Sequence, residues 1–403
     1  MRKGTDALLA IGSIAVVTIV PTVLVLLPSG KDDKDPGHLP DPAAAQLNAP
    51  IPTEALPTPT VSAPTVNGNQ APTNPFPTMN APSGNGGSTP KTNKPATGSK
   101  YAAADDGSSV TGVKWVDKAK TELDITVKST GLGKSVKVRL LVPKGWKPTA
   151  QRTWPTVYAY HGGNDGYVSW TRSTDIEQVA AKYDTLVAMP EGGSNGSYTD
   201  WYNGGKGGTP RWETFHTVEV RQLLERNFRA GPDRAAFGIS SGAQGAMSYA
   251  ARHPGLYKYT ASFSGVLSML SPGIPALLLY TNTRYGTNAT DIWGDPVLNR
   301  SNWAAHDPTT LVQRLKGTKV FVSSGNGKAG PYDNPDSAPW DIRYLSEGQV
   351  ERASKDFVAR AKELGVPVKS DFYGNGSHSW KYWQDEMHKV FPDIMATLGA
   401  RKF

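Results

Sequence analysis

The chain has 403 residues, of which 43 are basic and 35 acidic, so its formal net charge is +8. It contains no cysteine, which excludes disulfides, thiol nucleophiles, lipid attachment at a cysteine and cysteine-bound zinc. No run of lysine or arginine is denser than those at 114–120 and 134–139, so we expect a solvated basic surface and no nucleic-acid partner.

The first thirty residues carry the features of an export segment. Residues 7–27 are almost wholly apolar and long enough to cross a bilayer as a helix. Arg2 and Lys3 precede them, which by the positive-inside rule leaves the N-terminus in the cytoplasm and the rest outside. A cleaved signal peptide, giving a secreted protein, is the alternative. Because the run is longer than a usual signal core, an uncleaved membrane anchor over 1–30 is predicted.

Residues 31–100 differ in composition from the rest of the chain. They are rich in Pro, Ala, Thr, Asn, Ser and Gly, with Phe76 as the one aromatic residue. Such a segment buries too little apolar surface to offset its conformational entropy, so it is predicted to be a disordered linker. Residues 101–403 contain all 11 tryptophans, which indicates a single folded domain.

Segments typical of strands and helices alternate along this domain. The first two candidate strands, 123–128 and 135–142, alternate apolar with polar residues and are predicted to pair antiparallel. The other candidate strands are 156–161, 185–189, 234–240, 259–263, 318–323 and 368–373. The candidate helices are 174–182, 212–227, 241–252, 309–315, 347–364 and 381–398. This order predicts an α/β fold with a mostly parallel sheet, helices on both faces, and functional groups at the carboxyl ends of the strands.

One motif stands between a candidate strand and a candidate helix. Gly238-Ile239-Ser240-Ser241-Gly242 follows the apolar run 234–237 and precedes a stretch of helix-forming residues. Strand, Gly-x-Ser-x-Gly and helix form the nucleophile elbow of α/β-hydrolases, in which a tight turn exposes the serine. A second match, Gly192-Gly193-Ser194-Asn195-Gly196, is followed by a loop-like sequence. The context therefore selects Ser240 as the nucleophile.

A serine nucleophile needs a base and a carboxylate that orients the base, which in this fold occur in the order serine, acid, histidine. Among the histidines considered, His306 precedes the last two candidate strands and His388 lies within the last helix. His378 lies in a glycine-rich loop just after the final strand, so it is predicted to be the base. Five carboxylates qualify as the acid by their order in the chain: Asp333, Asp336, Asp341, Glu347 and Glu351.

An acyl-transfer site also needs two backbone amides that stabilise the developing oxyanion. The residue after the nucleophile, Ser241, is expected to supply one of them. Gly163, in the Tyr160–Asn164 loop after an earlier strand, is expected to supply the other, unless that loop is a plain turn. No His-x-x-x-His or similar spacing is present, so neither a metal nor another cofactor is expected.

Several blocks along 125–403 resemble the antigen 85 type of mycolyltransferase, in the esterase-D-like branch of the α/β-hydrolases. They are Met189–Gly193, Thr199–Tyr202, Trp212–Phe215, the elbow, Ile292–Gly294, Gly325–Gly327 and His378–Trp383, the last with the pattern His-Ser-Trp-x-Tyr-Trp. The segments 1–30 and 31–100 lie outside the resemblance.

The resemblance implies Ser240 as nucleophile, His378 as base, Glu347 as acid with Glu351 as the alternative, and Gly163 and Ser241 as oxyanion donors. It further implies a ping-pong reaction through an acyl-serine. The partners would be an acyl-ester donor, such as a glycolipid or sugar ester, and a sugar, another alcohol or water as acceptor.

Two positions depart from that family. Where it carries an Asp and an Arg that hold trehalose, this chain has His161 and Asn164 in a shorter loop. The resemblance therefore does not imply specificity for trehalose, although the nearby Asp165 could contact a sugar. Six tryptophans in predicted loops are candidates for lining a sugar or acyl site, and two or three of them are expected to do so: Trp170, Trp201, Trp293, Trp303, Trp340 and Trp380.

The leading hypothesis is an exported serine acyltransferase or esterase that acts on acyl esters (mycolyl esters among them) of sugars or glycolipids in the cell envelope. A plain carboxylesterase acting on sugar or polysaccharide esters shares the same first half-reaction. A non-catalytic envelope-binding protein on the same fold and a metal-dependent hydrolase are the remaining alternatives. The presence of Ser240, His378 and Gly163 argues against the non-catalytic binding protein. The lack of a cluster of metal-ligating residues argues against the metal-dependent hydrolase.

Overall fold

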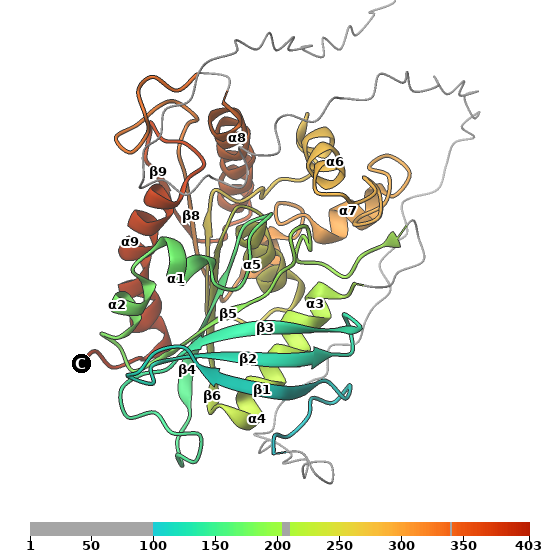
Figure 1. Ribbon diagram of the computed structural model, residues 1–403. Helices are drawn as coiled ribbons and strands as arrows, with labels where there is room; N and C mark the ends of the chain where they lie inside the picture. The colour runs from blue at the N-terminus through green and yellow to red at the C-terminus, as the bar shows by residue number, and fades with distance from the viewer. Residues whose placement is uncertain (1–99, 204–209, 339–340) are drawn as a thin grey trace, which may run out of the picture. The chain divides into compact units, whose positions relative to one another are not determined.

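The computed structural model describes residues 100–203, 210–338 and 341–403, and Figure 1 shows how they are arranged. Within these residues nine strands form one sheet, in the order β1-β2-β3-β5-β4-β6-β7-β8-β9. The strands are β1 Ser109–Trp115, β2 Glu122–Ser129, β3 Lys134–Leu141, β4 Trp154–Tyr160, β5 Leu186–Pro190, β6 Ala230–Ile239, β7 Tyr259–Phe263, β8 Lys319–Ser324 and β9 Val368–Phe372.

The sheet changes from antiparallel to parallel along its width. β1, β2, β3 and β5 pair antiparallel, whereas β5, β4, β6, β7, β8 and β9 pair parallel. The predicted mostly parallel sheet and its antiparallel opening pair are thus confirmed. β1 was not expected, because its sequence SVTGVKW has no regular alternation and much of it is exposed or half-buried at the edge of the sheet.

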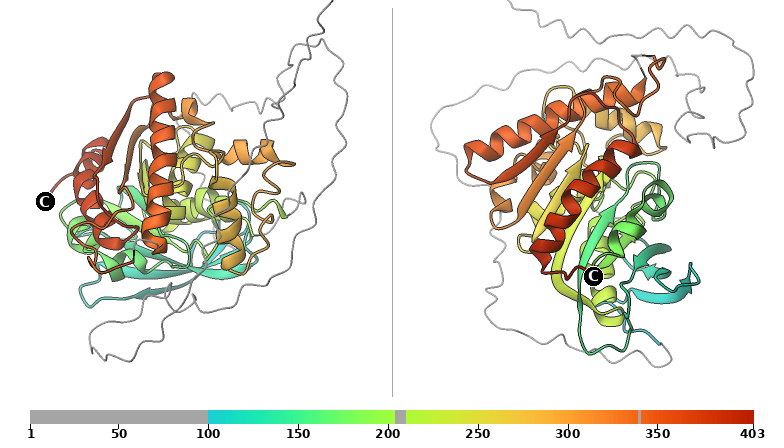
Figure 2. Two further views of the ribbon diagram at one scale, coloured as in Figure 1. Left: turned by 90° about the horizontal axis from the view of Figure 1, so that it is seen from above. Right: turned by 90° about the vertical axis from the view of Figure 1, so that its left-hand side faces the viewer.

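Helices cover both faces of the sheet, as Figure 2 shows from above. α1 (Ser169–Ser173), α2 (Ile176–Ala180) and α9 (Trp380–Leu398) pack on one face. The other face is covered by α3 (Trp212–Thr214), the π-helix η2 (Phe215–Val220), α4 (Arg221–Asn227), α5 (Ser240–Arg252), the 3₁₀ helix η3 (Val312–Leu315) and α8 (Ile342–Glu363).

The side chains of β4 contribute to the hydrophobic clusters on both faces of the sheet. Val157 and Ala159 pack into the cluster beneath α9, and Tyr158 and Tyr160 into the cluster beneath α5. Successive side chains of a strand point to opposite faces, so a strand buried on both faces is apolar throughout rather than alternating. This explains why the central strands appear in the sequence as continuous apolar runs.

The segment between β7 and β8 forms a cap that the sequence did not predict. It contains α6 (Ile274–Arg284) and α7 (Arg300–His306), which lie over a third hydrophobic cluster that includes Ile292, Trp293 and Trp303. α6 begins after Gly273, whose φ is +85°, with a proline in its first turn. Pro is well tolerated in the first turn of a helix, where the missing N–H would have no partner within the helix.

Part of the sequence prediction concerns residues that the structure does not describe. The expected membrane anchor (7–27), the linker up to residue 99 and Trp340 all lie outside the described residues. Among the helices of 100–203, 210–338 and 341–403, none combines the length and the apolar character needed to span a bilayer.

Candidate active site

The turn between β6 and α5 holds Ser240 in a strained backbone conformation. Ser240 is the first residue of α5 and has φ of 51°, in the left-handed region that non-glycine residues rarely occupy. A Cβ on Gly238 would lie 2.4 Å from the carbonyl carbon of Gly242, and a Cβ on Gly242 would lie 2.3 Å from the carbonyl oxygen of His161. Both glycines are therefore required sterically, and together they give the geometry of a nucleophile elbow.

The second Gly-x-Ser-x-Gly sequence has a different structure. Residues 192–199 contain only turns and bends, and no helix follows Ser194 within this stretch. Gly196 packs so tightly against the backbone of Gly192 that a Cβ there would lie 1.8 Å from its carbonyl oxygen. The prediction that this match lies in a loop is confirmed.

A carboxylate and an imidazole are hydrogen-bonded near the carboxyl ends of the parallel strands. His378, in the loop between β9 and α9, has its Nδ1 atom 2.6 Å from Oε2 of Glu347 on α8. The Glu347 side chain is fully buried, and that of His378 is 17% exposed. Because Nδ1 is engaged by the carboxylate, Nε2 is the ring nitrogen left to exchange a proton. Trp383 packs edge-on against the imidazole, with ring centroids 4.9 Å apart.

The second oxygen of Glu347 is held by three donors. Ser264 Oγ and the Gly325 amide each donate to Oε1 at 2.7 Å, and the Tyr373 hydroxyl lies 3.4 Å from it. Burial, reinforced by the charge of Glu347, raises the pKa of Tyr373 well above its ordinary value, so its hydroxyl stays protonated and able to donate. Trp383 Nε1 in turn donates to Ser264 Oγ at 2.9 Å.

Sequence reasoning missed this supporting layer. Ser264 directly follows β7 with φ of 54°, and its side chain is completely buried. A polar residue just after a buried strand, at the edge where the site was expected, was the available signal. Trp383 was noted only as part of the His-Ser-Trp-x-Tyr-Trp block.

The other candidate acids have different partners. Glu351, one turn further along α8, forms an ion pair with Lys355. Asp341 accepts a hydrogen bond from the Arg343 amide and thereby caps the start of α8. Asp333 binds the hydroxyls of Ser377 and Tyr382 and so fastens the loop that carries His378. Asp336 is exposed.

The other histidines that follow Ser240 are engaged elsewhere. Nδ1 of buried His306 contacts the Asn302 carbonyl, and burial lowers the pKa of this histidine to about 4. His253, at the end of α5, contacts Glu213, and His388 on α9 contacts Asp175.

The expected oxyanion donors are the amides of Ser241 and Gly163. Ser241 is the second residue of α5, and first-turn amides have no acceptor within their own helix. The loop after β4 passes close to the serine, because a Cβ on Gly162 would lie 3.5 Å from Ser240 Cβ. At the next residue, a Cβ on Gly163 would lie 3.1 Å from the ring of Tyr285, at the end of α6. The cap thus reaches the loop that carries the expected second donor.

His161 and its neighbours are occupied by contacts within the protein. His161 is buried; its Nε2 accepts from the Gly192 amide at 2.7 Å, and Nδ1 lies 2.7 Å from the Gly162 carbonyl. Both ring nitrogens therefore have partners within the protein, and His161 supports the loop after β4. Asn164 has φ of 56° and donates its amide to the Ser194 carbonyl, and Asp165 forms an ion pair with Arg172.

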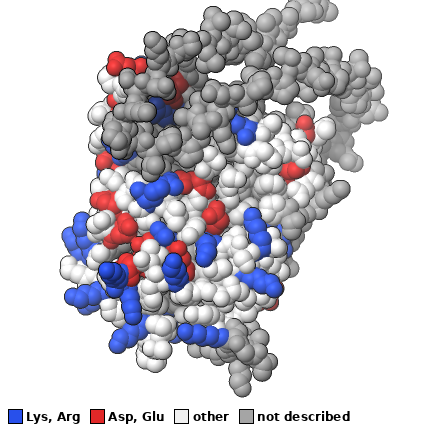
Figure 3. All heavy atoms as spheres, viewed as in Figure 1, with Lys and Arg blue, Asp and Glu red and all other residues white. Residues whose placement is uncertain are grey.

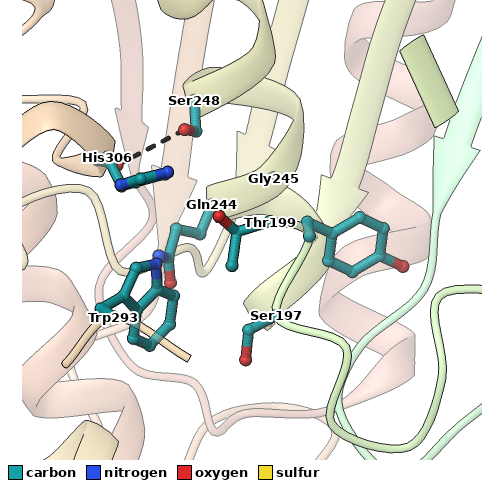
Figure 4. Close-up of a pocket in the computed structure, with 8 residues that line it drawn as sticks. Ser197, Thr199, Gln244, Gly245, Ser248, Trp293 and His306 are labelled. Carbon is teal, nitrogen blue, oxygen red and sulfur yellow. Dashed lines mark hydrogen bonds between the residues drawn. The ribbon is translucent and has the colours of Figure 1, made fainter. Parts of the chain in front are cut away.

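The candidate tryptophans divide by burial. Trp170 and Trp303 are fully buried, and Trp293 is 2% exposed and packs on Trp303. Figure 4 shows Trp293 beside Gln244 at a narrow pocket that has no room for a water molecule. Trp201 and Trp380 are partly exposed; Trp201 donates to the Gly196 carbonyl, and Trp380 packs edge-on against Trp170 and Trp383.

Within the described residues, no group of three or more His, Asp or Glu side chains is placed to hold a metal ion. The described residues instead include a serine at a strained turn and a hydrogen-bonded imidazole and carboxylate, which are residue types that acyl transfer uses.

Comparison with known proteins identifies the family. The model of the Esterase family ("Putative esterase") matches residues 129–394. Diacylglycerol acyltransferase/mycolyltransferase Ag85A of Mycobacterium ulcerans is 33% identical over 291 residues, with 68% of this chain and 81% of that protein covered. The crystal structure of Mycobacterium tuberculosis MPT51 (FbpC1) matches with a TM-score of 0.56 and 26% identity, covering 67% of this chain and 96% of that one.

A ferulic acid esterase shares the fold, with a TM-score of 0.51 at 20% identity over 69% of this chain and 98% of that one. The family model spans well over half of the chain, and the Ag85A relative matches along most of its own length. The chain therefore belongs to the esterase family of the α/β-hydrolases and, within it, to the antigen 85 type.

Proposed function

We propose that this protein is an exported acyltransferase or esterase that uses Ser240 as nucleophile, His378 as general base and Glu347 as the carboxylate that orients the base. The observation that carries the proposal is the 2.6 Å hydrogen bond between Glu347 and His378, in a domain whose Ser240 occupies a strained elbow. The membership of the antigen 85 type supports the same reaction class.

The first half-reaction forms an acyl-enzyme. Ser240 Oγ attacks the ester carbonyl while its proton moves to Nε2 of His378. The amides of Gly163 and Ser241 stabilise the negative oxygen of the tetrahedral intermediate. The bond to the donor alcohol then breaks, and that alcohol leaves with the proton from His378. Glu347 orients the imidazole of His378 and stabilises the imidazolium that forms.

The second half-reaction reverses these steps with a new nucleophile. His378 takes the proton of an incoming hydroxyl, whose oxygen attacks the acyl-serine, and then returns a proton to Ser240 Oγ. A sugar or other alcohol as the acceptor gives a transferred ester, whereas water gives a free acid. The name of the Ag85A relative, a diacylglycerol acyltransferase and mycolyltransferase, favours transfer of acyl groups, mycolyl groups among them.

A plain carboxylesterase is the second candidate. The positions at which the resemblance implies trehalose contacts hold His161 and Asn164, and His161 is buried with both ring nitrogens occupied. An acceptor site for trehalose therefore has less support than the acyl-serine chemistry.

The test is a product analysis of the full chain with a p-nitrophenyl acyl ester, with and without trehalose, by mass spectrometry. A sugar ester as main product would establish a transferase, and free acid alone would favour the esterase or a different acceptor. Absence of turnover, with Ser240 unlabelled by a fluorophosphonate probe, would contradict the proposal and favour the non-catalytic binding protein.

The assignment of the acid has a matched control on the same helix. Glu347→Gln should lower kcat/KM by about a thousandfold or more, because the imidazole loses its orienting carboxylate. Glu351→Gln, one helical turn away and paired with Lys355, should keep near-normal activity. The opposite pattern would move the acid to Glu351.

A further inference from the structure

The cap between β7 and β8 exposes two apolar side chains at the tip of a tightly built turn. Val297 and Leu298 are 79% and 84% exposed, more than any other large apolar side chain in the described part of the chain. They stand between α6 and α7 along the chain, in the part of the molecule seen at the upper right of Figure 3, where charged side chains of both signs are visible. We call Val297 and Leu298 the apolar tip.

The turn that carries the apolar tip is fixed at both ends. Asp295 Oδ1 accepts hydrogen bonds from the amides of Val297 and Leu298 at 2.8 and 2.9 Å. Asn299 accepts from the Asp295 amide through its side chain and donates to the Tyr202 hydroxyl. Gly294, with φ of +80°, packs directly against the Asn299 side chain. The amides of Val297 and Leu298 thus have hydrogen-bond acceptors within the turn. The turn is ordered, and it holds the two apolar side chains in their exposed positions.

α6, in the same cap as the tip, also carries apolar side chains that are not fully buried. Leu277, Leu278 and Leu279 are partly exposed where they pack on the third hydrophobic cluster, and Tyr280 is 56% exposed. α6 ends at Arg284, and its neighbour Tyr285 reaches Gly163 beside Ser240. The end of α6 thus lies close to the loop that carries the expected second oxyanion donor.

Cationic side chains lie near these apolar residues. Arg284, at the end of α6, contacts the Tyr280 hydroxyl, and Arg300, at the start of α7, is exposed. No ion pair joins either of them to a carboxylate of the described residues. The acidic residues of the intervening loop are engaged locally: Asp295 binds the amides of the turn, and Asp291 accepts from Asn288.

We propose that the apolar tip and α6 form a lipid-docking surface, through which Val297 and Leu298 insert into a lipid layer with anionic headgroups. A rigid convex tip suits insertion into a soft layer, whereas a protein partner would need a matching hollow. Apolar side chains bordered by arginines complement acyl chains beneath phosphate groups. The inference deepens the proposed function, on which it rests for the substrate: a lipid ester would reach Ser240 from the layer on which the domain docks.

The insertion can be measured independently of activity, because the chain has no cysteine of its own. The full chain carrying Leu298→Cys is labelled with a polarity-sensitive fluorophore and reconstituted with vesicles of phosphatidylcholine and phosphatidylglycerol. Val116→Cys, at an apolar residue that is 44% exposed just beyond β1, is the matched control. A blue shift and quenching by spin-labelled lipids are expected at 298 and not at 116. Equal behaviour of the two positions, or no change at either, would overturn the proposal.

A second measurement addresses the role of the surface in turnover. The double variant Val297→Ser, Leu298→Ser should lose about tenfold or more in turnover of a long-chain ester held in such vesicles, while turnover of a short soluble ester is unchanged. Val116→Ser should change neither. Equal loss on both esters would contradict docking and indicate a damaged site.

The remaining outcomes separate the alternatives. If the wild type turns over neither ester, the proposed function fails, and the fluorescence result still decides the insertion. If light scattering in detergent shows a dimer that the double variant dissociates, without any spectral shift at 298, the tip binds a second copy of the chain and the proposal is wrong.

Discussion

Ser240, the proposed nucleophile, has an unfavourable backbone conformation. A non-glycine residue in the left-handed region costs about 1 kcal/mol or more, and such strain persists only where neighbouring structure enforces it. Here the enforcing groups are the strand β6, the helix α5 and the close contacts of Gly238 and Gly242. Strained backbone conformations of this kind cluster at functional sites, which agrees with the proposed role of Ser240.

Ser240→Gly should therefore raise the free energy of unfolding by about 1 kcal/mol, because glycine adopts φ of 51° without strain. The same variant should lose its turnover of esters. Ser240→Ala, which keeps the Cβ, should lose turnover without gaining stability. Chemical denaturation measures the free energy of unfolding, and an ester assay measures turnover. Equal stability of the two variants would show that the backbone conformation of Ser240 does not lower the stability of the protein.

Ser264 is a positioning residue, because it acts on the carboxylate of Glu347 rather than on substrate. Ser264→Ala removes a charge-assisted hydrogen bond and leaves Trp383 Nε1 without its acceptor. We expect the unfolding free energy to fall by about 2 kcal/mol and kcat to fall about tenfold, with KM little changed.

Ser262 provides the matched control for Ser264, since it lies two residues earlier on β7, is equally buried, and has a hydroxyl without a hydrogen-bond partner among the described residues. Ser262→Ala should be neutral or slightly stabilising and fully active. If both variants lose kcat to the same extent, the effect reflects general packing at β7 and not the support of Glu347.

At the scale of elements, the elbow depends on how closely α5 approaches β4. A Cβ on Gly242 would meet backbone atoms of Tyr160 and His161 at 2.7 and 2.3 Å, which no rotamer change can relieve. Gly242→Ala should therefore separate α5 from the loop after β4, lowering the unfolding free energy by about 2 kcal/mol or more and the activity with it.

Gly348 on α8 is the contrasting position. Its nearest neighbour, the Asn326 carbonyl oxygen, would lie 3.4 Å from an added Cβ, which is an ordinary contact. Gly348→Ala should stabilise α8 by about 0.5–1 kcal/mol through reduced backbone entropy of the unfolded chain. Thermal unfolding of the two variants tests the pair; destabilisation of both would show that α8 also lacks room at this residue.

For the whole molecule, buried histidines make stability depend on pH. Burial lowers the pKa of His216 to about 3 and that of His306 to about 4, below their ordinary value of 6.5. Between pH 6.5 and these values the unfolded chain binds protons that the folded chain does not. Stability should therefore fall with decreasing pH, by about 1.4 kcal/mol per pH unit for each such histidine.

Glu213 adds to this trend at lower pH. Its burial would raise its pKa, but hydrogen bonding from His253 and the charge of Arg252 lower the pKa to about 2. The ionised Glu213 carboxylate therefore stabilises the folded state above pH 4.5, and this stabilisation is lost as the pH falls towards 2. Denaturation of wild type and His216→Gln across about pH 3–7 checks the assignment of the histidine: the variant should show a shallower decline, and an unchanged profile would contradict it.

The sequence predicted the central strands well, because their signals are local. β7 matches its predicted range of 259–263, and the boundaries of β6 and α5 reflect an apolar run and the glycine spacing of the elbow. α8 begins earlier than predicted, at Ile342, because the side chain of Asp341 caps it. The cap helices α6 and α7 were missed, since their stability comes from packing on Trp293 and Trp303 rather than from a periodic pattern.

By itself, the sequence determined the elbow serine, the histidine loop, the mostly parallel sheet and the family. These depend on steric limits of short segments and on apolar patterns, both of which are written along the chain. Chain order left five carboxylates open and the resemblance favoured Glu347. The tertiary structure shows that Glu347 is hydrogen-bonded to His378, that Ser264 binds Glu347 and Trp383 packs on His378, and that His161 is buried. Those contacts join segments far apart in sequence, and they exist because packing of α8, β7 and α9 at the edge of one sheet brings the segments together.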